Sequence, residues 1–265
     1  MNIISTEELK EIQLGILDYV HQFCIDNHIK YWLDCGTLLG AVRHKGYIPW
    51  DDDVDIGMLR VDFERFRSIF EDPNGRYHFI CGDNDSTFFG AHGKVLDTST
   101  VLYEPDLNGY KSCVNIDVFV YDNAPDNDKE FKKMYDKRDL YRTCTVFQKM
   151  PGITKNDTIV RKCVKNMLHV ILAFFPDGYF LRKMIDNCKK YKDISTKRVG
   201  NFTSYSRTYC STSAFLSTTF VQFEGKEYFA PVGYDEWLKS LYGNYMKLPP
   251  AEKQVSHHEF IAFRL

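Results

Sequence analysis

No Cys-x-x-Cys pair occurs in this chain of 265 residues, although it contains eight cysteines, and no cysteines and histidines cluster at short spacing. Structural zinc sites need several such ligands close together in the sequence. A structural zinc site is therefore disfavoured. Most of the cysteines lie among apolar or helical residues, so we expect them to be buried free thiols in a reducing cytosol.

Neither sign of charge is in excess. The chain has 34 lysine and arginine residues against 36 aspartate and glutamate residues, and its formal net charge is −2. Proteins that bind nucleic acid usually carry a strongly basic surface. The composition thus argues against a nucleic-acid partner, and any binding of anions must come from local clusters.

A secretion signal is also missing. The first residues contain no basic segment, no apolar run and no cleavage site with small residues. We therefore expect a cytoplasmic protein whose mature chain starts at or near Met1, with the inner face of the membrane as the alternative location.

The chain lacks an apolar run long enough to span a bilayer, which needs about 20 residues. The most apolar segment is residues 160–184, which combines apolar side chains with the basic residues Arg161, Lys162, Lys165, Arg182 and Lys183. Such a segment can lie on a membrane surface, but a buried core helix with basic ends explains the same pattern. The sequence favours the core helix.

Apolar periodicity predicts an α+β protein with a helical second half. Ser5 begins a capping box, and the apolar residues after it recur at helical spacing. The other predicted elements are strands at 31–34, 77–81, 94–96 and 114–120, helices at 36–43 and 62–70, a mostly helical stretch at 128–191, a hairpin at 221–229 that turns at Glu224 and Gly225, and a helix at 234–242.

No repeat, low-complexity segment or long linker divides the chain. We therefore predict a single domain over residues 1–265. Within it we expect a catalytic core over about 1–125, a helical segment over about 126–215, and a C-terminal hairpin and helix over about 216–265.

The residues that point to chemistry form the acidic run at 51–56. In Asp53-Val54-Asp55-Ile56 the acids alternate with apolar residues, so on a strand both carboxylates would share one face. Two carboxylates one pleat apart repel each other unless they share a cation, and Mg²⁺ typically binds one or two carboxylates plus substrate phosphates. Asp117 has the same apolar neighbours. Together these acids predict a magnesium site, with Mn²⁺ as the alternative ion.

Two other interpretations of the acidic run are weaker. A solvated turn has no reason to place Val54 and Ile56 between the acids. A calcium-binding EF-hand loop would use Asp51, Asp53 and Asp55, but its sixth position needs glycine, and a β-branched isoleucine stands there.

Residues 33–56, which read LDCGTLLGAVRHKGYIPWDDDVDI, resemble the signature of the LicD family of phosphocholine transferases, relatives of the fukutin-type ribitol-phosphate transferases. Residues 115–119 and 242–250 resemble the same family, and the resemblance spans about residues 31–258. It implies a nucleotidyltransferase-type fold, with a small mixed β-sheet flanked by helices.

The resemblance also implies roles for single residues. Gly36 and Thr37 would contact the phosphate of the donor, Asp53 and Asp55 would hold the metal, and Asp117 would be the third acid, as a metal ligand or as a base. Asp51 and Asp52 have weaker claims to ligand roles.

The implied reaction moves phosphocholine, or a related phospho-alcohol, from CDP-choline or a similar CDP-alcohol to a hydroxyl of a glycan, and it releases CMP. The acceptor would be a lipopolysaccharide, a teichoic-acid precursor or another lipid-linked glycan. A nucleotidyltransferase that uses a nucleoside triphosphate, and a glycan-binding protein without activity, are the alternatives.

Further candidates lie near these motifs. Arg43, His44, Lys45 and Lys94 could contact phosphate, although surface cations are common. Choline binds aromatic faces. Five aromatic residues near the motifs could form such a site, although each is more simply explained as a core or rim residue: Trp32, Tyr47, Trp50, Phe88 and Phe89. We include Trp50 among the candidate substrate-binding residues. His257 and His258 are candidates without an assigned role.

Overall fold

The computed structural model describes residues 2–82, 84–85, 87–104, 110–150, 157–204, 206–255 and 261–265. The chain starts with β1 (Asn2–Ile3) and α1 (Thr6–Asp26). The side chain of Ser5 caps α1 by accepting a hydrogen bond from the backbone N–H of Glu8 at 3.2 Å, which confirms the predicted cap. The apolar side of α1 is buried, as its periodicity predicts.

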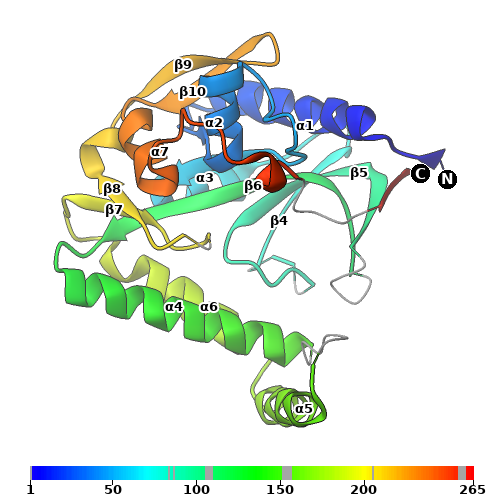
Figure 1. Ribbon diagram of the computed structural model, residues 1–265, viewed down its shortest axis with the longest axis vertical. Helices are drawn as coiled ribbons and strands as arrows, with labels where there is room; N and C mark the ends of the chain where they lie inside the picture. The colour runs from blue at the N-terminus through cyan, green and yellow to red at the C-terminus, as the bar shows by residue number, and fades with distance from the viewer. Residues whose placement is uncertain are drawn as a thin grey trace.

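A nine-stranded mixed sheet forms the middle layer (Figure 1). Its main path runs β1, β11 (Ile261–Arg264), β5 (Gly93–Glu104), β6 (Tyr110–Ala124), β3 (Asp55–Leu59) and β2 (Trp32–Leu33). Strand β4 (Tyr77–Cys81) pairs with β5, while β7 (Arg198–Asn201) joins β6 and β8 (Tyr209–Ser211). The sheet is mixed because β3 is parallel to β6, whereas the neighbouring pairs are antiparallel.

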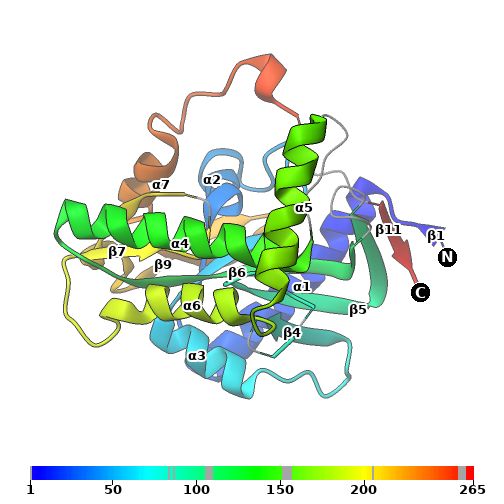
Figure 2. The same ribbon diagram turned by 90° about the horizontal axis from the view of Figure 1, so that it is seen from below.

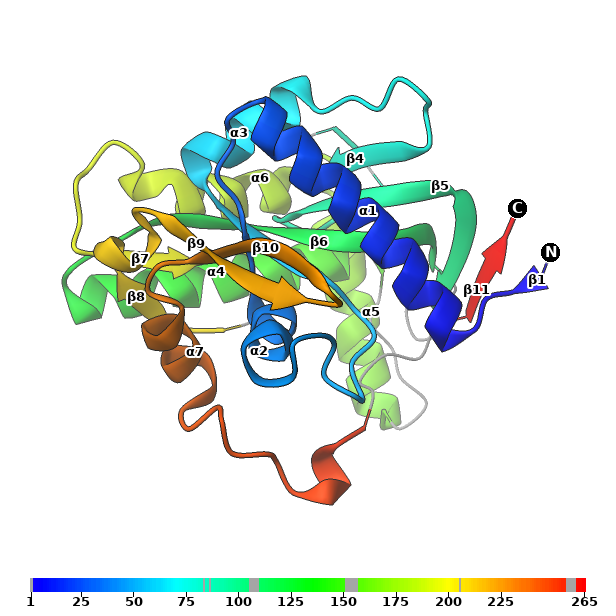
Figure 3. The ribbon, with the colours of Figure 1, turned by 90° about the horizontal axis from the view of Figure 1, so that it is seen from above.

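Helices cover both faces of the sheet. Helix α1, helix α2 (Cys35–His44) and the hairpin of β9 (Thr218–Phe223) and β10 (Lys226–Pro231) lie on one face (Figure 3). Helices α4 (Asp128–Lys149) and α6 (Tyr179–Cys188) lie on the other face, with α5 (Ile159–Ala173) beyond them (Figure 2). The other α-helices of the described residues are α3 (Arg60–Ile69) and α7 (Tyr234–Tyr242), and short 3-10 helices lie at Lys189–Tyr191, Thr212–Phe215 and Ala251–Lys253.

The α+β class is confirmed, and the nucleotidyltransferase-type fold stays a prediction. One apolar core includes residues from both ends of the chain, among them Leu9, Ile56, Trp237 and Ala262. The division of the chain into domains likewise stays a prediction. All eight cysteines have free thiols, and seven of them are buried or half-buried.

The sheet is larger than the small sheet we expected. Strands β7 and β8 lie in the segment predicted to be helical to about residue 215, and β11 lies in a tail for which no strand was predicted. These strands have only three or four residues, so they have no room for a detectable alternation of apolar and polar side chains. The predicted hairpin is confirmed: Glu224 and Gly225 both have positive φ, at 48° and 78°, as a tight two-residue turn requires.

The interpretation of residues 160–184 as a buried core helix is wrong for α5. None of the residues of α5 is buried. Helix α6, by contrast, buries five of its residues against the rest of the protein. Within the part of the chain that the structure describes, no helix is both long enough and apolar enough to cross a membrane.

Candidate active site

Two parallel strands bring the predicted acids together. In the β3–β6 pair, Asp55 lies opposite Asp117, and the backbone N–H of Asp117 donates to the carbonyl oxygen of Val54 at 2.9 Å. Val54 and Ile56 are buried in the core, as the alternation predicts. Asp53 precedes β3 and remains half-exposed. The proximity of Asp55 and Asp117, inferred only from matching local patterns, is therefore confirmed.

The start of α2 packs against the same strand. The hydroxyl of Thr37 accepts a hydrogen bond from the backbone N–H of Asp55 at 2.9 Å, and Thr37 is buried. Gly36 lies against Asp51, because a Cβ atom at Gly36 would be only 2.6 Å from Asp51 Oδ2. Residue 36 must therefore be glycine if the Asp51 carboxylate is to keep its position.

Asp34, which precedes α2, links three parts of the protein. Its carboxylate accepts hydrogen bonds from the Tyr121 hydroxyl at 2.5 Å, Trp237 Nε1 at 2.8 Å and the backbone N–H of Cys35 at 2.8 Å. Asp34 is fully buried, and burial raises its pKa although these hydrogen bonds oppose the shift. This carboxylate therefore joins α2 to β6 and α7.

The carboxylates of Asp51, Asp52 and Asp53 form an acidic group that is suited to a divalent cation. One ligand oxygen from each of Asp51, Asp52 and Asp53 lies within 4.8 Å of the others. Burial raises the pKa of Asp55 well above its usual value, and the neighbouring carboxylates of Asp53 and Asp117 raise it further. Carboxylate oxygens are the ligands that Mg²⁺ prefers, and a bound cation would relieve this repulsion. The donor set of Asp51, Asp52 and Asp53 therefore fits magnesium, and Asp51 and Asp52 have a stronger claim to ligand roles than the sequence analysis gave them.

Lys94 contacts the third acid. In the antiparallel β5–β6 pair, Lys94 lies opposite Asp117, and its ammonium is 2.7 Å from Asp117 Oδ1 and 2.9 Å from Asn115 Oδ1. His92 Nε2 is 3.6 Å from Asp117 Oδ2. Burial lowers the pKa of His92 to about 4, so the ring is neutral at pH 7.

His92 is a site residue that the sequence analysis missed. It stands two positions before Lys94, so the same alternation that pairs Asp53 with Asp55 would have placed it on the face of Lys94.

The other predicted cations contact the protein itself. Arg43 donates to the carbonyl oxygen of Tyr245 at 2.8 Å and to His44 Nε2 at 2.9 Å. Lys45 ends α2 with φ at 62°, and its carbonyl oxygen accepts from the backbone N–H of Glu224. These contacts join α2 to the β9–β10 turn and to the segment after α7. Contact of Arg43, His44 and Lys45 with phosphate stays a prediction.

Of the aromatic candidates, Tyr47, Trp50 and Phe89 are half-buried, and a role of any of them in binding choline stays a prediction. Trp50 lies directly before the acidic run, and its ring centroid is 6.5 Å from that of His44. Trp32 is buried in the core against Tyr121 and Phe215, and Phe88 is buried as well. His257 and His258 lie outside the described residues.

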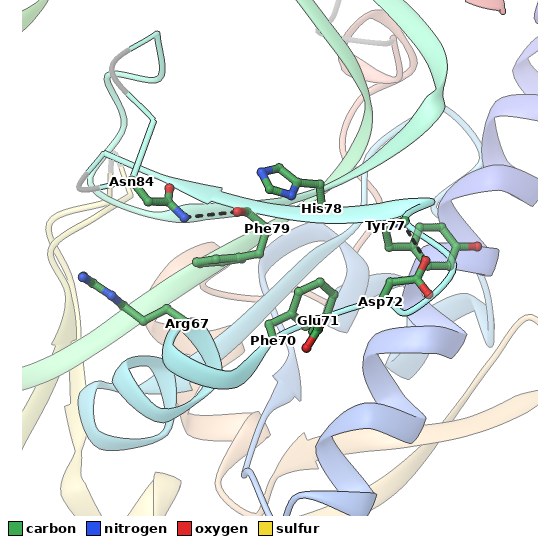
Figure 4. A pocket seen from close by; sticks show the side chains of 9 residues that line it. Arg67, Phe70, Glu71, Asp72, Tyr77, His78, Phe79 and Asn84 are labelled. Atoms are coloured by element: carbon green, nitrogen blue, oxygen red, sulfur yellow. Dashed lines mark hydrogen bonds between the residues drawn. The ribbon is translucent and has the colours of Figure 1, made fainter.

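A pocket of about 320 Å³ lies between α3 and β4 (Figure 4). Its lining includes Arg67, Phe70, Tyr77 and Asn84, and Asn84 donates to the carbonyl oxygen of Phe79 at 3.2 Å. None of the predicted site residues lines this pocket. The acidic group and this pocket are therefore separate features.

Known proteins resemble the chain over this part of the sequence. The model of the LicD/FKTN/FKRP nucleotidyltransferase domain matches residues 28–96, which include α2, the acidic run and Lys94. The chain is 36% identical over 98 residues to an uncharacterized protein of Rickettsia typhi, covering 34% of this chain and 32% of that protein. Over 34 residues it is 56% identical to human Ribitol 5-phosphate transferase FKRP, covering 13% of this chain and 7% of that protein.

One similarity extends along almost the whole chain. The sequence is 30% identical over 260 residues to the Lipopolysaccharide cholinephosphotransferase LicD of Haemophilus influenzae. The alignment covers 97% of this chain and 97% of that protein, and so includes Asp53, Asp55 and Asp117 together with the helices between β6 and β7. The chain belongs to the LicD family.

Proposed function

We propose that the chain is a metal-dependent transferase. It moves phosphocholine, or a related phospho-alcohol, from a CDP-linked donor to a hydroxyl of a cell-surface glycan and releases CMP. The observation that carries this proposal is the β3–β6 register, which sets Asp55 beside Asp117 in a chain similar to a cholinephosphotransferase along its whole length.

The acids and their neighbours would have different roles in the reaction. Asp53 and Asp55 would hold magnesium, with Asp51 adjacent, and the ion would offset negative charge on the phosphates. The acceptor hydroxyl oxygen attacks the phosphorus next to choline, and the bond from that phosphorus to the oxygen retained by CMP breaks. Asp117 would act as the general base that takes the proton of the acceptor hydroxyl. Lys94 would orient the Asp117 carboxylate.

Donor binding tests this proposal directly. Isothermal titration with Mg²⁺ would compare CDP-choline, CDP-ethanolamine, CDP-ribitol and CTP. We expect a CDP-alcohol to bind most tightly, and we expect Asp53→Asn with Asp55→Asn to lose at least about tenfold in affinity, because charged ligands to a metal are removed. The matched control is Asp193→Asn, since Asp193 is an exposed aspartate of another segment.

Each contrary result has a distinct meaning. Selective binding of CTP, with release of pyrophosphate, would indicate a nucleotidyltransferase that uses the same acids. Absence of binding by any nucleotide would contradict the proposed enzyme class. Equal binding by the wild type and the double variant would show that Asp53 and Asp55 take no part in binding the donor.

A further inference from the structure

Helix α5 is amphipathic, with its apolar and polar residues on opposite sides. At 100° per residue, the apolar side chains of Val160, Val164, Met167, Ile171 and Phe174 fall within one half of the helix circumference. The other half carries the basic and polar residues, namely Arg161, Lys162, Lys165, Asn166 and His169. A helix with this pattern normally turns its apolar half toward the protein.

The orientation here is the reverse. The half-buried residues of α5 include Lys162, Lys165, His169 and Leu172, which recur at helical spacing on the side that meets α4. His169 Nδ1 is 2.7 Å from the carbonyl oxygen of Phe147, a residue of α4. The polar half of the helix therefore faces the protein.

The apolar half faces outward. Val160 is 72% exposed, Met167 55%, Ile171 49% and Phe174 86%. Figure 1 shows α5 beyond α4, on the side of α4 away from the sheet. Several exposed apolar side chains on one side of a helix indicate a contact with an apolar partner, because monomeric proteins rarely expose contiguous apolar patches larger than a few hundred Å².

The segment that contains α4, α5 and α6 has an excess of basic residues, and this excess favours an anionic partner. Residues 128–193 contain 16 lysine and arginine residues against eight aspartate and glutamate residues, whereas the whole chain has 34 against 36. Arg161 is exposed at the border of the apolar half. Two copies of the chain meeting through this face would bring two basic surfaces together, and anionic headgroups would neutralise them instead.

We propose that α5 docks the protein on a lipid bilayer that contains anionic lipid. The apolar half enters the boundary between headgroups and acyl chains, and Arg161 at its border contacts the headgroups. With 15 residues, α5 is too short to cross the bilayer and lies in the plane of its surface.

Vesicle sedimentation tests this docking face. The wild type should bind vesicles of phosphatidylcholine mixed with phosphatidylglycerol, and it should bind pure phosphatidylcholine more weakly. The double variant Ile171→Ser with Phe174→Ser should lower the partition coefficient at least about tenfold, because two exposed apolar side chains no longer enter the lipid. Arg161→Glu should lower binding about fivefold on the mixed vesicles only.

The control variant is Val61→Ser with Leu216→Ser, which changes apolar side chains of comparable exposure outside α5. It should bind the mixed vesicles like the wild type. Reversing Lys162 and Lys165 is a poorer test, since both side chains are half-buried on the side that meets α4.

Failure of the wild type to bind mixed vesicles would overturn the proposal, and so would unchanged binding by the α5 double variant. A wild-type dimer in light scattering that the α5 variant converts to a monomer, with no vesicle binding by either protein, would assign the face to a second copy. CDP-choline titration of the α5 variant should match the wild type, so failure of docking and failure of the proposed function are distinguishable.

Discussion

At the scale of single residues, the site depends on how closely backbone and carboxylates approach each other. Gly36 and Asp51 leave no space for an additional atom between them. Thr37 is tied to the backbone of Asp55, and Lys94 is tied to Asp117. Thr37, Lys94 and Asp117 are thus held by a neighbour before any ligand binds.

The substitution Gly36→Ala tests the contact with Asp51. The added Cβ would lie 2.6 Å from Asp51 Oδ2, so the carboxylate must move. We expect Mg²⁺-dependent binding of CDP-choline to weaken about tenfold, measured by titration calorimetry, with little change in the melting temperature. Gly15→Ala in α1 is the control, and an equal loss of binding in that variant would show that the effect is not local.

His21 makes stability depend on pH. Its Nδ1 is 2.6 Å from the buried Tyr31 hydroxyl, and burial lowers the pKa of His21 below its usual 6.5. The unfolded chain therefore binds more protons near pH 6, so the contribution of neutral His21 is complete above pH 6.5 and is lost as the pH falls toward the lowered pKa.

The variant His21→Phe keeps an aromatic ring but leaves the Tyr31 hydroxyl without this partner. In urea unfolding at pH 7.5 we expect it to lose about 1–2 kcal/mol of stability. The deficit should shrink at pH 5.5. At that pH the unfolded wild type binds more protons at His21 than the folded wild type does, which lowers the stability of the wild type and not that of the variant. A deficit that does not change with pH would contradict the assignment.

At the scale of elements, α7 is attached to the site by a buried polar contact. Trp237 Nε1 and the Tyr121 hydroxyl both donate to Asp34, which no water can solvate at full burial. The substitution Trp237→Phe removes one donor to a buried carboxylate. We expect a loss of about 1.5–3 kcal/mol in the free energy of unfolding.

A double-mutant cycle with Tyr121→Phe would show whether the two donors act on the same carboxylate. We expect the combined loss to differ from the sum by at least about 0.5 kcal/mol. Tyr245→Phe is the matched control, since its hydroxyl donates to Asp235 at the surface. Strict additivity of the Trp237 and Tyr121 variants would argue against a shared partner.

At the scale of the whole molecule, the proposed metal site predicts that metal binding is coupled to folding. Burial and the carboxylates of Asp53 and Asp117 raise the pKa of Asp55, so the folded chain without metal carries a repulsion that the unfolded chain lacks. A ligand that binds only the folded state raises its stability. We expect Mg²⁺ at about 100 times its dissociation constant to add about 2.7 kcal/mol of stability.

Thermal unfolding with and without Mg²⁺ measures this coupling. The variant Asp53→Asn with Asp55→Asn should lose the response to Mg²⁺ and, without metal, should be at least as stable as the wild type. Asp193→Asn should respond like the wild type. A full Mg²⁺ response in the double variant would place the ion on other residues.

Local patterns are sufficient where neighbouring residues decide the structure. The Ser5 cap, the turn at Glu224 and Gly225, and the helix Tyr234–Tyr242 are all confirmed, because each depends on side chains within a few positions. The short strands β7, β8 and β11 could not be predicted. They exist because an edge of the sheet is available to them, and that edge is built by residues far away in the sequence.

The sequence by itself determined which carboxylates are candidates for the site, since the acids alternate with apolar residues that had to enter a core. The tertiary structure decided which partners those acids have: the pairing of Asp55 with Asp117, and the contacts of Asp117 with Lys94 and His92. It also decided the direction of α5. A period of 3.6 residues separates an apolar side of a helix from a polar one, but only packing against α4 determines which side meets the solvent.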